Sequence, residues 1–366
     1  MSAPRGARKV TLLTVARAVG VSPTTVSNAY NRPRKLSPAL RERILAAARD
    51  LGYPGPDPAA RSLRRGRAGS IGLLFGEALT YVFRDPGAVE FLRGLAEGSA
   101  RHNTALQIIA ALDADEQEGA ASLLANAIVD GLVVWTLPDR HPILRLARDR
   151  GIPLVIHGGP RVNGVPFVGI DDRAAAKATA EHLLQLGHRS LAVVSHPFGP
   201  ARRAWRRDAA KPGRPSYRVT RGRLTGYKAA ADAAAPKPAT LTIYEVAVSS
   251  RDEGHLAGLA LLHGTPRPTA VLAMSDELAV GVLAAARELG LRVPDDVSVA
   301  GWDDSPSARA GDPPLTTIRQ SLHDQGRTCA RLLIAATRGE IAADELVHLE
   351  PWQLIVRDST ASPSPT

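Results

Sequence analysis

Apolar residues near the start of the chain recur every three or four positions, the spacing that places them on one face of an α-helix. Val15 and Val19 mark one such face, and Val26 and Ala29 mark a second. Gly20 stands between them and permits the tight turn that two crossing helices need. A third apolar row runs through residues 40–51. The pattern predicts three short helices, the first two with helix-turn-helix spacing.

Polar residues mark where these helices begin. Ser22 and Ser37 are suitable N-caps, and a proline follows each at the first helical position, where its missing N–H costs nothing. The second helix is therefore expected to begin at Pro23. Its leading side chains are short and polar, which suits a helix end that enters the major groove of DNA. They are Pro23, Thr24, Thr25, Ser27 and Asn28.

Residues 57–67 predict a further helix, which is too short to be stable by itself in water. It carries Leu63 among four arginines, one of them Arg61. Leu63 either docks on the neighbouring domain or inserts as an apolar wedge into the minor groove of DNA. The residues alone leave both interpretations open.

From about residue 70, short apolar runs alternate with amphipathic helical segments such as 173–186 and 276–289, a pattern typical of parallel α/β architecture. About nine strands are too many for one compact unit, so we expect two similar lobes with a cleft between them. The expected strands are 71–75, 105–110, 131–135, 154–156, 167–170, 191–195, 240–248, 270–274 and 297–301.

Ligands of open parallel sheets bind beyond the carboxyl ends of the strands. Several residues follow expected strand ends and are therefore candidates. Asp276 is better explained as the cap of its helix, whereas Asp303 has no following helix to cap. The candidates are Gly76 with Glu77, His157 with Gly158, Ser275 with Asp276, and Trp302 with Asp303.

Charge separates the two parts of the chain. The net charge is +10, but residues 1–67 hold 14 Lys and Arg against three acids, whereas the other 299 residues carry 32 bases and 33 acids. A basic module joined to a nearly neutral domain indicates nucleic-acid binding. A basic disordered tail is the alternative, and the regular helix caps argue against it.

Composition narrows the class further. The 366 residues suggest two or three domains, and 44% hydrophobic content excludes disorder as the main state. The single cysteine, Cys329, allows no internal disulfide, and the chain has neither a signal peptide nor an apolar run long enough for a membrane span. We expect a cytoplasmic, nucleoid-associated protein. Because the common catalytic motifs are missing, we expect no enzymatic activity, cofactor or metal.

Four motifs bring these observations together. They are Val15-Ala16, the run from Gly20 to Ser27, Leu51-Gly52-Tyr53, and Ala60-Arg61-Ser62-Leu63. With them the chain resembles the LacI family of transcriptional regulators. The resemblance implies a small all-α helix-turn-helix domain (1–56), a hinge helix (57–67), an α/β domain of two parallel-sheet lobes similar to periplasmic binding proteins (68–360), and a disordered tail (361–366). The first lobe would hold about 68–170 and 320–345, the second about 171–319 and 346–360.

The resemblance also implies roles in DNA binding. Thr24 and Asn28 would read bases beside Pro23, and Leu63, with Arg61 close by, would be the hinge wedge. Asn28 stands where many members have arginine, and Thr14 where the first helix usually has an acid. The residues expected to hold phosphates are Thr11, Ser22, Thr25, Ser27, Asn31 and Ser37.

In the larger domain, the runs beginning at Gly301 and Arg223 match family segments that bind an effector. Asp303 and Arg223 would contact a sugar or another polyhydroxylated ligand, with Glu77, Ser275, Asp276 and Trp302 nearby. Arg218 and Arg221 compete with Arg223 for that role, and Gly158-Gly159 replaces an aspartate of many sugar-binding members.

The resemblance therefore implies a regulator, most simply a repressor, that binds a pseudo-palindromic operator as a homodimer and responds to an effector. The segment 356–366 has no heptad repeat, so no tetramer is expected. Two alternatives are a constitutive DNA-binding regulator without a ligand, and a solute-binding or enzymatic α/β protein whose basic N-terminus is incidental.

Overall fold

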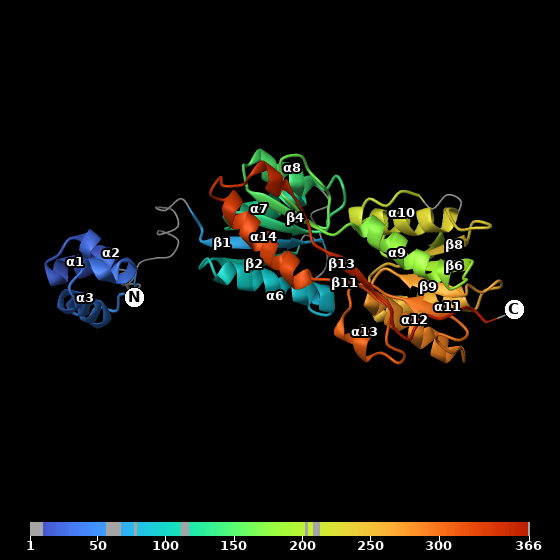
Figure 1. Ribbon diagram of the computed structural model, residues 1–366. Helices are drawn as coiled ribbons and strands as arrows, with labels where there is room; N and C mark the ends of the chain where they lie inside the picture. Colours follow the sequence, from blue (N-terminus) through green and yellow to red (C-terminus); the bar gives the residue numbers. More distant parts are fainter. Residues whose placement is uncertain are drawn as a thin grey trace, which may run out of the picture. The chain divides into compact units, whose positions relative to one another are not determined.

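The computed structural model describes residues 10–55, 67–76, 79–110, 117–201, 204–207 and 213–364. The chain divides into two compact units, Met1–Ala68 and Gly69–Thr366. The first unit is helical and the second contains the sheets (Figure 1). No helix in the described part of the chain has both the length and the apolar character needed to cross a membrane.

The first unit contains the three helices expected from the apolar pattern, α1 (Leu12–Val19), α2 (Pro23–Asn31) and α3 (Pro38–Asp50). A short 3-10 turn, η1 (Pro33–Lys35), precedes α3. Val15, Val26 and Ile44, one from each helix, are fully buried and form the core with their neighbours. Gly20 adopts a φ of 72°, which lets the chain turn sharply from α1 into α2.

The first lobe of the second unit is built on a parallel sheet. Within the described residues, six strands lie in the order β12-β5-β4-β3-β1-β2. The strands are β1 (Ser70–Phe75), β2 (Ala105–Ala110), β3 (Leu132–Trp135), β4 (Leu154–His157), β5 (Phe167–Gly169) and β12 (Val347–Leu349). The helices are α5 (Leu79–Val82), α6 (Pro86–Ala100), α7 (Gln117–Asn126), α8 (Pro142–Asp149) and α14 (Leu322–Ala336), followed by the 3-10 turn η2 (Ala343–Leu346).

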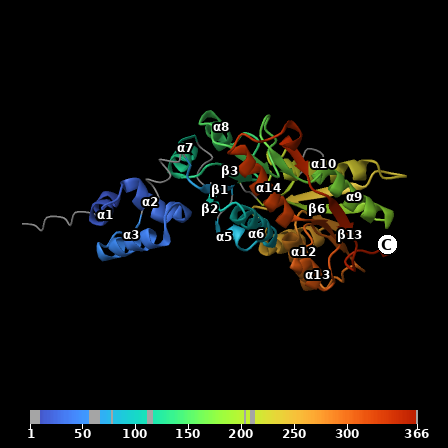
Figure 2. The same cartoon turned by 60° about the vertical axis from the view of Figure 1, so that its left-hand side comes forward.

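Helices α6 and α14 lie side by side along this lobe (Figures 1 and 2). Glycines permit that approach, because a Cβ added to Gly94 would lie 1.8 Å from the carbonyl oxygen of His323. A Cβ on Gly326 of α14 would similarly lie 2.2 Å from the carbonyl oxygen of Phe91. The backbones of the two helices are therefore in contact where the helices cross, and the pair covers one side of the hydrophobic core of the first lobe.

The second lobe contains another sheet, in which five described strands lie in the order β10-β9-β6-β8-β7. They are β6 (Ser190–Ser195), β7 (Trp205–Arg207), β8 (Thr240–Glu245), β9 (Ala270–Ala273) and β10 (Ser298–Ala300), and β7 alone of these five is antiparallel to its neighbour. The helices are α9 (Asp172–Gln185), α10 (Arg218–Asp232), α11 (Arg251–Leu262), α12 (Asp276–Glu288) and α13 (Pro306–Ala310). The fold class of two parallel-sheet lobes is confirmed.

Within its described residues the two-lobed unit crosses between the lobes three times. One crossing follows β5, and the other two run through β11 (Thr317–Gln320) and β13 (Trp352–Ile355), which pair antiparallel with each other. The expected division at residue 346 needs a correction, because β12 (Val347–Leu349) pairs with β5 in the first lobe. The last crossing therefore begins after β12.

Candidate functional site

The start of α2 presents the polar side chains expected at DNA. Ser22 caps the helix, since its Oγ accepts the backbone N–H of Thr25 at 3.1 Å. Its hydroxyl also lies 2.8 Å from the hydroxyl of Thr25. Ser22, Pro23 and Thr24 are exposed, as are Thr11 and Ser37 at the starts of α1 and α3. These side chains are therefore available to a ligand of this unit.

The other DNA-binding candidates on α2 are half-buried. The Asn28 side chain makes no hydrogen bond within the described part of the chain, whereas Asn31 donates from Nδ2 to the carbonyl oxygen of Ser27 at 3.0 Å and lies 3.2 Å from the Ser27 hydroxyl. Asn31 and Ser27 therefore hold each other on the helix surface. Arg61 and Leu63 lie outside the described residues, and so does most of the expected hinge helix.

Thr14 takes over part of the capping that an acid would provide in α1. Its Oγ1 accepts the backbone N–H of Thr11 at 3.3 Å, and the two hydroxyls lie 3.2 Å apart. Although threonine replaces the acid usual at this position, the backbone N–H of Thr11 at the helix start still has a hydrogen-bond acceptor.

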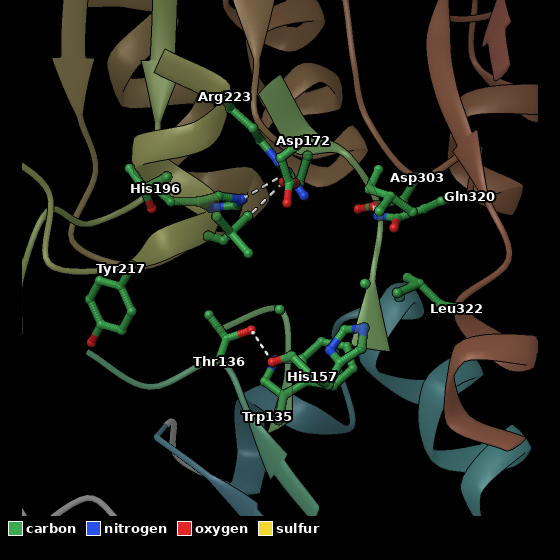
Figure 3. A pocket seen from close by; sticks show the side chains of 18 of the residues that line it. Trp135, Thr136, His157, Asp172, His196, Tyr217, Arg223, Asp303, Gln320 and Leu322 are labelled. Carbon is green, nitrogen blue, oxygen red and sulfur yellow. Dashed lines mark hydrogen bonds and ion pairs between the residues drawn. The ribbon is translucent and has the colours of Figure 1, made fainter. Parts of the chain in front are cut away.

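A pocket lies where strand ends of both lobes meet, and its cavity measures about 140 Å³ (Figure 3). The first lobe contributes residues after β3, β4 and β5, and the second contributes residues after β6 and β9 and from α10. Its lining includes Asp85, Trp135, Thr136, His157, Gly158, Asp172, His196, Tyr217, Thr220, Arg223, Ser249, Ser275, Asp303, Gln320, Leu322 and Gln325. This is the position at which parallel sheets bind ligands.

Arg223 and Asp172 form the buried ionic centre of the pocket. Nε of Arg223 donates to Oδ1 of Asp172 at 3.0 Å, and the same guanidinium donates to the carbonyl oxygen of Met274. Cζ of Arg223 lies 3.9 Å from the ring centroid of Trp302, a cation–π contact. Burial raises the pKa of Asp172, while the positive charge of Arg223 opposes that rise. The pocket therefore supplies the arginine with its own counterion.

Asp303 supplies a second carboxyl group to the pocket. Its Oδ1 accepts a hydrogen bond from Nε2 of Gln320 at 2.7 Å. Burial raises its pKa to about 7, and the neighbouring charges of Asp276 and Asp85 act in the same direction. Its φ of 106° is unusual for a residue with a side chain, and such strain is concentrated at functional sites. At neutral pH this carboxyl group can either accept or donate a hydrogen bond.

An aromatic wall faces these charges from the first lobe. The rings of Trp135 and His157 stack with centroids 4.6 Å apart, and Phe91 packs edge-on against Trp135 at 4.5 Å. Nε2 of His157 lies 2.8 Å from Oε1 of Gln325, while Nδ1 is buried without a hydrogen-bond partner among the described residues. Burial lowers the pKa of His157 to about 4, so the ring is neutral at pH 7.

His196 stands beside Arg223 on the opposite side. Its Nε2 lies 3.4 Å from Nη1 of Arg223, and burial lowers its pKa to about 3, with the charge of Arg223 acting in the same direction. Both histidines are therefore uncharged at neutral pH. The pocket joins aromatic surface to hydrogen-bonding groups, and its described charges are one guanidinium and up to three carboxylates, those of Asp85, Asp172 and Asp303.

Of the residues expected at an effector, Arg223, Ser275 and Asp303 line the pocket. Asp276 and Trp302 do not belong to its described lining. Asp276 accepts hydrogen bonds from the backbone N–H of Ser305 and the hydroxyl of Thr317, both at 2.7 Å, and Trp302 is fully buried behind Arg223. Glu77 lies outside the described residues.

The helix cap expected at Asp276 is a further correction. Ser275 is the N-cap of α12, because its Oγ accepts the backbone N–H of Leu278 at 3.2 Å. Among the three competing arginines, Arg223 lines the pocket, Arg221 forms an ion pair with Asp139, and Arg218 lies over the ring of Phe167.

Some lining residues were missed although a signal existed. Trp135 ends β3 and His196 follows β6, so the rule that selected other strand ends applied to them as well. Asp172 and Gln320 had no such signal. Asp172 begins α9 and resembles an ordinary helix-start acid, while Gln320 ends the crossing strand β11, whose place in the fold depends on distant pairing.

A helical unit with a polar helix start, joined to a two-lobed domain of parallel sheets, defines the class of DNA-binding transcriptional regulators. The sequence profile described as bacterial regulatory proteins, lacI family, matches residues 11–55. The profile described as periplasmic binding protein-like domain matches residues 180–360. Together with the relatives below, these matches place the chain in the LacI family, to which it belongs.

Relatives match the chain over nearly its full length. An HTH-type transcriptional regulator of Mycobacterium tuberculosis is 37% identical over 361 residues, covering 98% of this chain and 99% of the relative. The regulator IpsA of Corynebacterium glutamicum is 39% identical over 343 residues, covering 93% and 94%. These relatives are transcriptional regulators and not enzymes, which excludes the enzymatic alternative.

Solved structures agree with this assignment. A LacI-family regulator from Corynebacterium glutamicum has a TM-score of 0.73 at 32% identity, covering 97% of this chain and 99% of the other. The complex of the regulator CelR with cellobiose has a TM-score of 0.67 at 28% identity, covering 96% and 99%. The lac repressor dimer bound to operator, with a TM-score of 0.76 at 24% identity, supports the fold.

Proposed function

We propose that this DNA-binding regulator is a repressor whose affinity for its operator is controlled by a small polyhydroxylated effector bound between the lobes. The observation that carries the proposal is the pocket itself, which takes its lining from both sheets and the crossing segments. A ligand held by both lobes binds one arrangement of them more tightly than another. Ligand binding and lobe closure are then coupled.

The chemistry of the pocket favours an uncharged ligand. Arg223 already has Asp172 as its counterion, and the remaining described charged groups of the lining are the carboxyl groups of Asp85 and Asp303. A phosphate ester or a carboxylate would be repelled by these carboxylates, and the two nearest arginines, Arg223 and Arg218, both face Asp172 at 3.0 and 3.8 Å. Hydroxyl groups can donate to Asp303, and the stacked rings of Trp135 and His157 offer apolar surface to the carbon skeleton of a sugar or polyol.

The unpartnered Nδ1 of His157 supports the presence of a ligand. A buried polar atom without a partner costs free energy, and a ligand hydroxyl or a bound water would remove that cost. The CelR relative was solved with cellobiose, a neutral sugar, which agrees with this class of ligand.

On DNA, the proposal assigns base contacts to Thr24 and Asn28, with Pro23 beside them, and phosphate contacts to Thr11, Ser22, Thr25, Ser27, Asn31 and Ser37. Leu63 and Arg61 would act from the hinge segment. Two copies of α2 in a homodimer would meet two half-sites of a pseudo-palindromic operator. Effector-driven movement of the lobes would change how the hinge segments meet DNA.

Operator affinity measured with and without ligands tests this function. The full-length chain is screened by thermal shift against neutral sugars and polyols and, as a matched set, their phosphate esters, and each hit is added to an operator-binding titration. We expect a neutral compound to stabilise the chain and to change operator affinity. Hits confined to phosphorylated compounds would contradict the ligand class.

A broad panel without any hit would favour the alternative of a constitutive regulator. The internal pairing of Arg223 with Asp172 and of Asp303 with Gln320 is the observation that keeps this alternative in view, because it satisfies these polar groups without a ligand.

A further inference from the structure

Beside the pocket, a short segment of the second lobe contacts the first lobe. The backbone N–H of Asp139, in the turn after β3, donates to the carbonyl oxygen of Ser216 at 2.9 Å, and Pro138 forms an isolated antiparallel bridge with Tyr217. Asp139 also accepts both ends of the Arg221 guanidinium, at 2.8 and 3.1 Å. Backbone pairing and a two-point ion pair therefore join the lobes at one place.

The second-lobe side of this contact is anchored in its own lobe. Arg221 lies in α10 and also donates to the carbonyl oxygen of Pro215 at 2.7 Å. The backbone N–H of Ser216 donates to the carbonyl oxygen of Phe198 at 2.7 Å. The backbone N–H of Phe198 in turn donates to the buried carboxylate of Glu245, at the end of β8, at 2.7 Å. The segment thus moves with the second sheet.

On the first lobe, a strained turn directs the chain toward the second lobe. Thr136 has a φ of 36°, which is rare for a β-branched residue, and the chain passes from it through Leu137 to Pro138 and Asp139. Strain of this kind persists where surrounding contacts hold it and is concentrated at functional sites. The contact of Asp139 with Ser216 and Arg221 is one of the interactions that hold this turn.

The pocket lies directly beside this contact. Thr136 and Tyr217 both line the pocket, and Figure 3 shows them on the same side of it. Thr136 precedes Asp139 by three residues, and Tyr217 directly follows Ser216. A movement of the lobes apart at Asp139 and Ser216 would therefore displace two residues of the pocket lining.

We propose that Asp139 and Arg221 form an interlobe latch, which holds the two lobes closed over this side of the pocket and positions Tyr217 and Thr136 in its lining. They are positioning residues, because they act through the lining. The effect of the latch on an effector rests on the proposed function, whereas its effect on the lobes does not.

The ion pair suits a reversible latch. The side chains are 34% exposed for Asp139 and 25% exposed for Arg221, so water still reaches the pair and breaking it leaves no deeply buried charge. The buried pair Arg223–Asp172, at 7% and 5%, lies entirely within the second lobe and cannot take this role. The lobes can therefore separate at Asp139–Arg221 while the ionic centre of the pocket stays intact.

Lobe separation and amide exchange in the full-length chain test the latch without any ligand. Spin labels are placed on cysteines introduced at exposed helix positions of the two lobes, Asp149 in α8 and Ala233 after α10, since the native Cys329 is buried. Interlobe distances are then compared between the parent and the variants Asp139→Asn and Arg221→Gln. Asp232→Asn is the matched control, because Asp232 pairs with Lys228 within the exposed surface of α10.

We expect both latch variants to shift the label distance to longer and broader values and to speed exchange at the amide of Asp139, whose N–H donates across the lobes, by about tenfold or more. Asp232→Asn should behave as the parent. The charge-reversed double variant, Asp139→Arg with Arg221→Asp, should restore part of the population of molecules with closed lobes that the single variants lose. Unchanged distances and exchange in both single variants, with the fold intact by circular dichroism, would overturn the latch.

Cellobiose, the sugar in the CelR complex, serves as a defined probe of the effect on a ligand. If it binds the parent, the latch variants should bind it at least several-fold more weakly. If the lobes open in the variants but no sugar ever changes operator affinity, the latch stands and the proposed function fails.

Discussion

Nε of Arg223 donates to Oδ1 of Asp172 at 3.0 Å, and this pair joins the start of α9 to the first turns of α10 inside the pocket. Both side chains are almost fully buried, at 7% and 5% exposure. The arginine is therefore a structural element of the second lobe as well as a candidate ligand contact.

Replacing Asp172 with asparagine should destabilise the second unit by about 3 kcal/mol, because it leaves the guanidinium buried without a negative partner. The double variant Asp172→Asn with Arg223→Gln should recover part of that loss. Thermal unfolding of the parent, the two single variants and the double variant gives the coupling energy. Additive losses in the double variant would mean that the two side chains act independently.

Asp303 should set the pH dependence of effector binding. The pKa of its carboxyl group is raised to about 7 by burial, and the ionised form is the one that accepts a ligand hydroxyl without competition from its own proton. Affinity should fall as pH decreases below 7, by up to about tenfold per unit if ionisation is required. The pKa values of His157 and His196, about 4 and 3, lie below this range, so these rings stay neutral across it.

The variant Asp303→Asn should lose the effector response and its pH dependence while keeping operator affinity. Isothermal titration between pH 6 and 8, together with operator binding at each pH, measures both properties. If the variant loses operator binding as well, Asp303 has a structural role in the lobe instead.

The close approach of the lobes at Gly159 leads to a third prediction. A Cβ on Gly159 would lie 2.5 Å from the Cβ of Arg218, and its φ of 138° disfavours any other residue. Gly159→Ala should therefore cost roughly 1–3 kcal/mol and force α10 away from the first lobe. Gly164→Ala is the control, because Gly164 also has a positive φ of 75° but no described atom within 4 Å.

Thermal unfolding of both glycine variants measures that difference. Gly164→Ala carries only the strain of a left-handed backbone, so the gap between the two variants reports the contact of the lobes together with the greater backbone strain at Gly159. Equal losses would show that backbone conformation accounts for the whole effect and that Arg218 yields without cost.

Local signals in the sequence predicted most of the fold. Ser22-Pro23 and Ser37-Pro38 located the starts of α2 and α3, and apolar runs located nine of the eleven described strands of the two sheets, since caps and burial act over a few residues. The missed strands β7, β11, β12 and β13 have three or four residues each and depend on partners far along the chain. Short segments of this kind carry too little periodicity to be recognised.

The pocket was predictable where it follows strand ends and unpredictable where it depends on pairing. Ser275 and Asp303 were found by their position after β9 and β10, and Arg223 by resemblance. Asp172 joins Arg223 across 51 residues, and Asp276 leaves the pocket because Thr317 and Ser305 bind it. Neither pairing leaves a mark in the local sequence.

On the DNA side, Asn28 and Asn31 should behave differently although both lie on α2. Asn31 is held by Ser27, whereas Asn28 stands at a proposed base-reading position. Asn28→Ala should cost about 1–3 kcal/mol against the preferred base pair and little against others. Asn31→Ala should weaken binding evenly across sequences. Binding of both variants to a library of operator sequences measures these losses. A uniform loss for Asn28→Ala would mean that Asn28 contacts the DNA phosphate backbone and not a base.

The uneven distribution of charge should control the salt dependence of DNA binding. Residues 1–67 carry +11, and in the described part of this segment Arg17, Arg32, Arg34, Lys35 and Arg43 are exposed. Each phosphate neutralised on duplex DNA contributes about −0.9 to the slope of log affinity against log salt. We expect a steep slope for the full chain and none for residues 69–366, which form a separate compact unit. Arg49 is paired with Glu42 at 2.9 Å, so Arg49→Ala should change the slope less than Arg34→Ala. A steep slope retained by residues 69–366 would place a DNA-binding surface on the two-lobed unit.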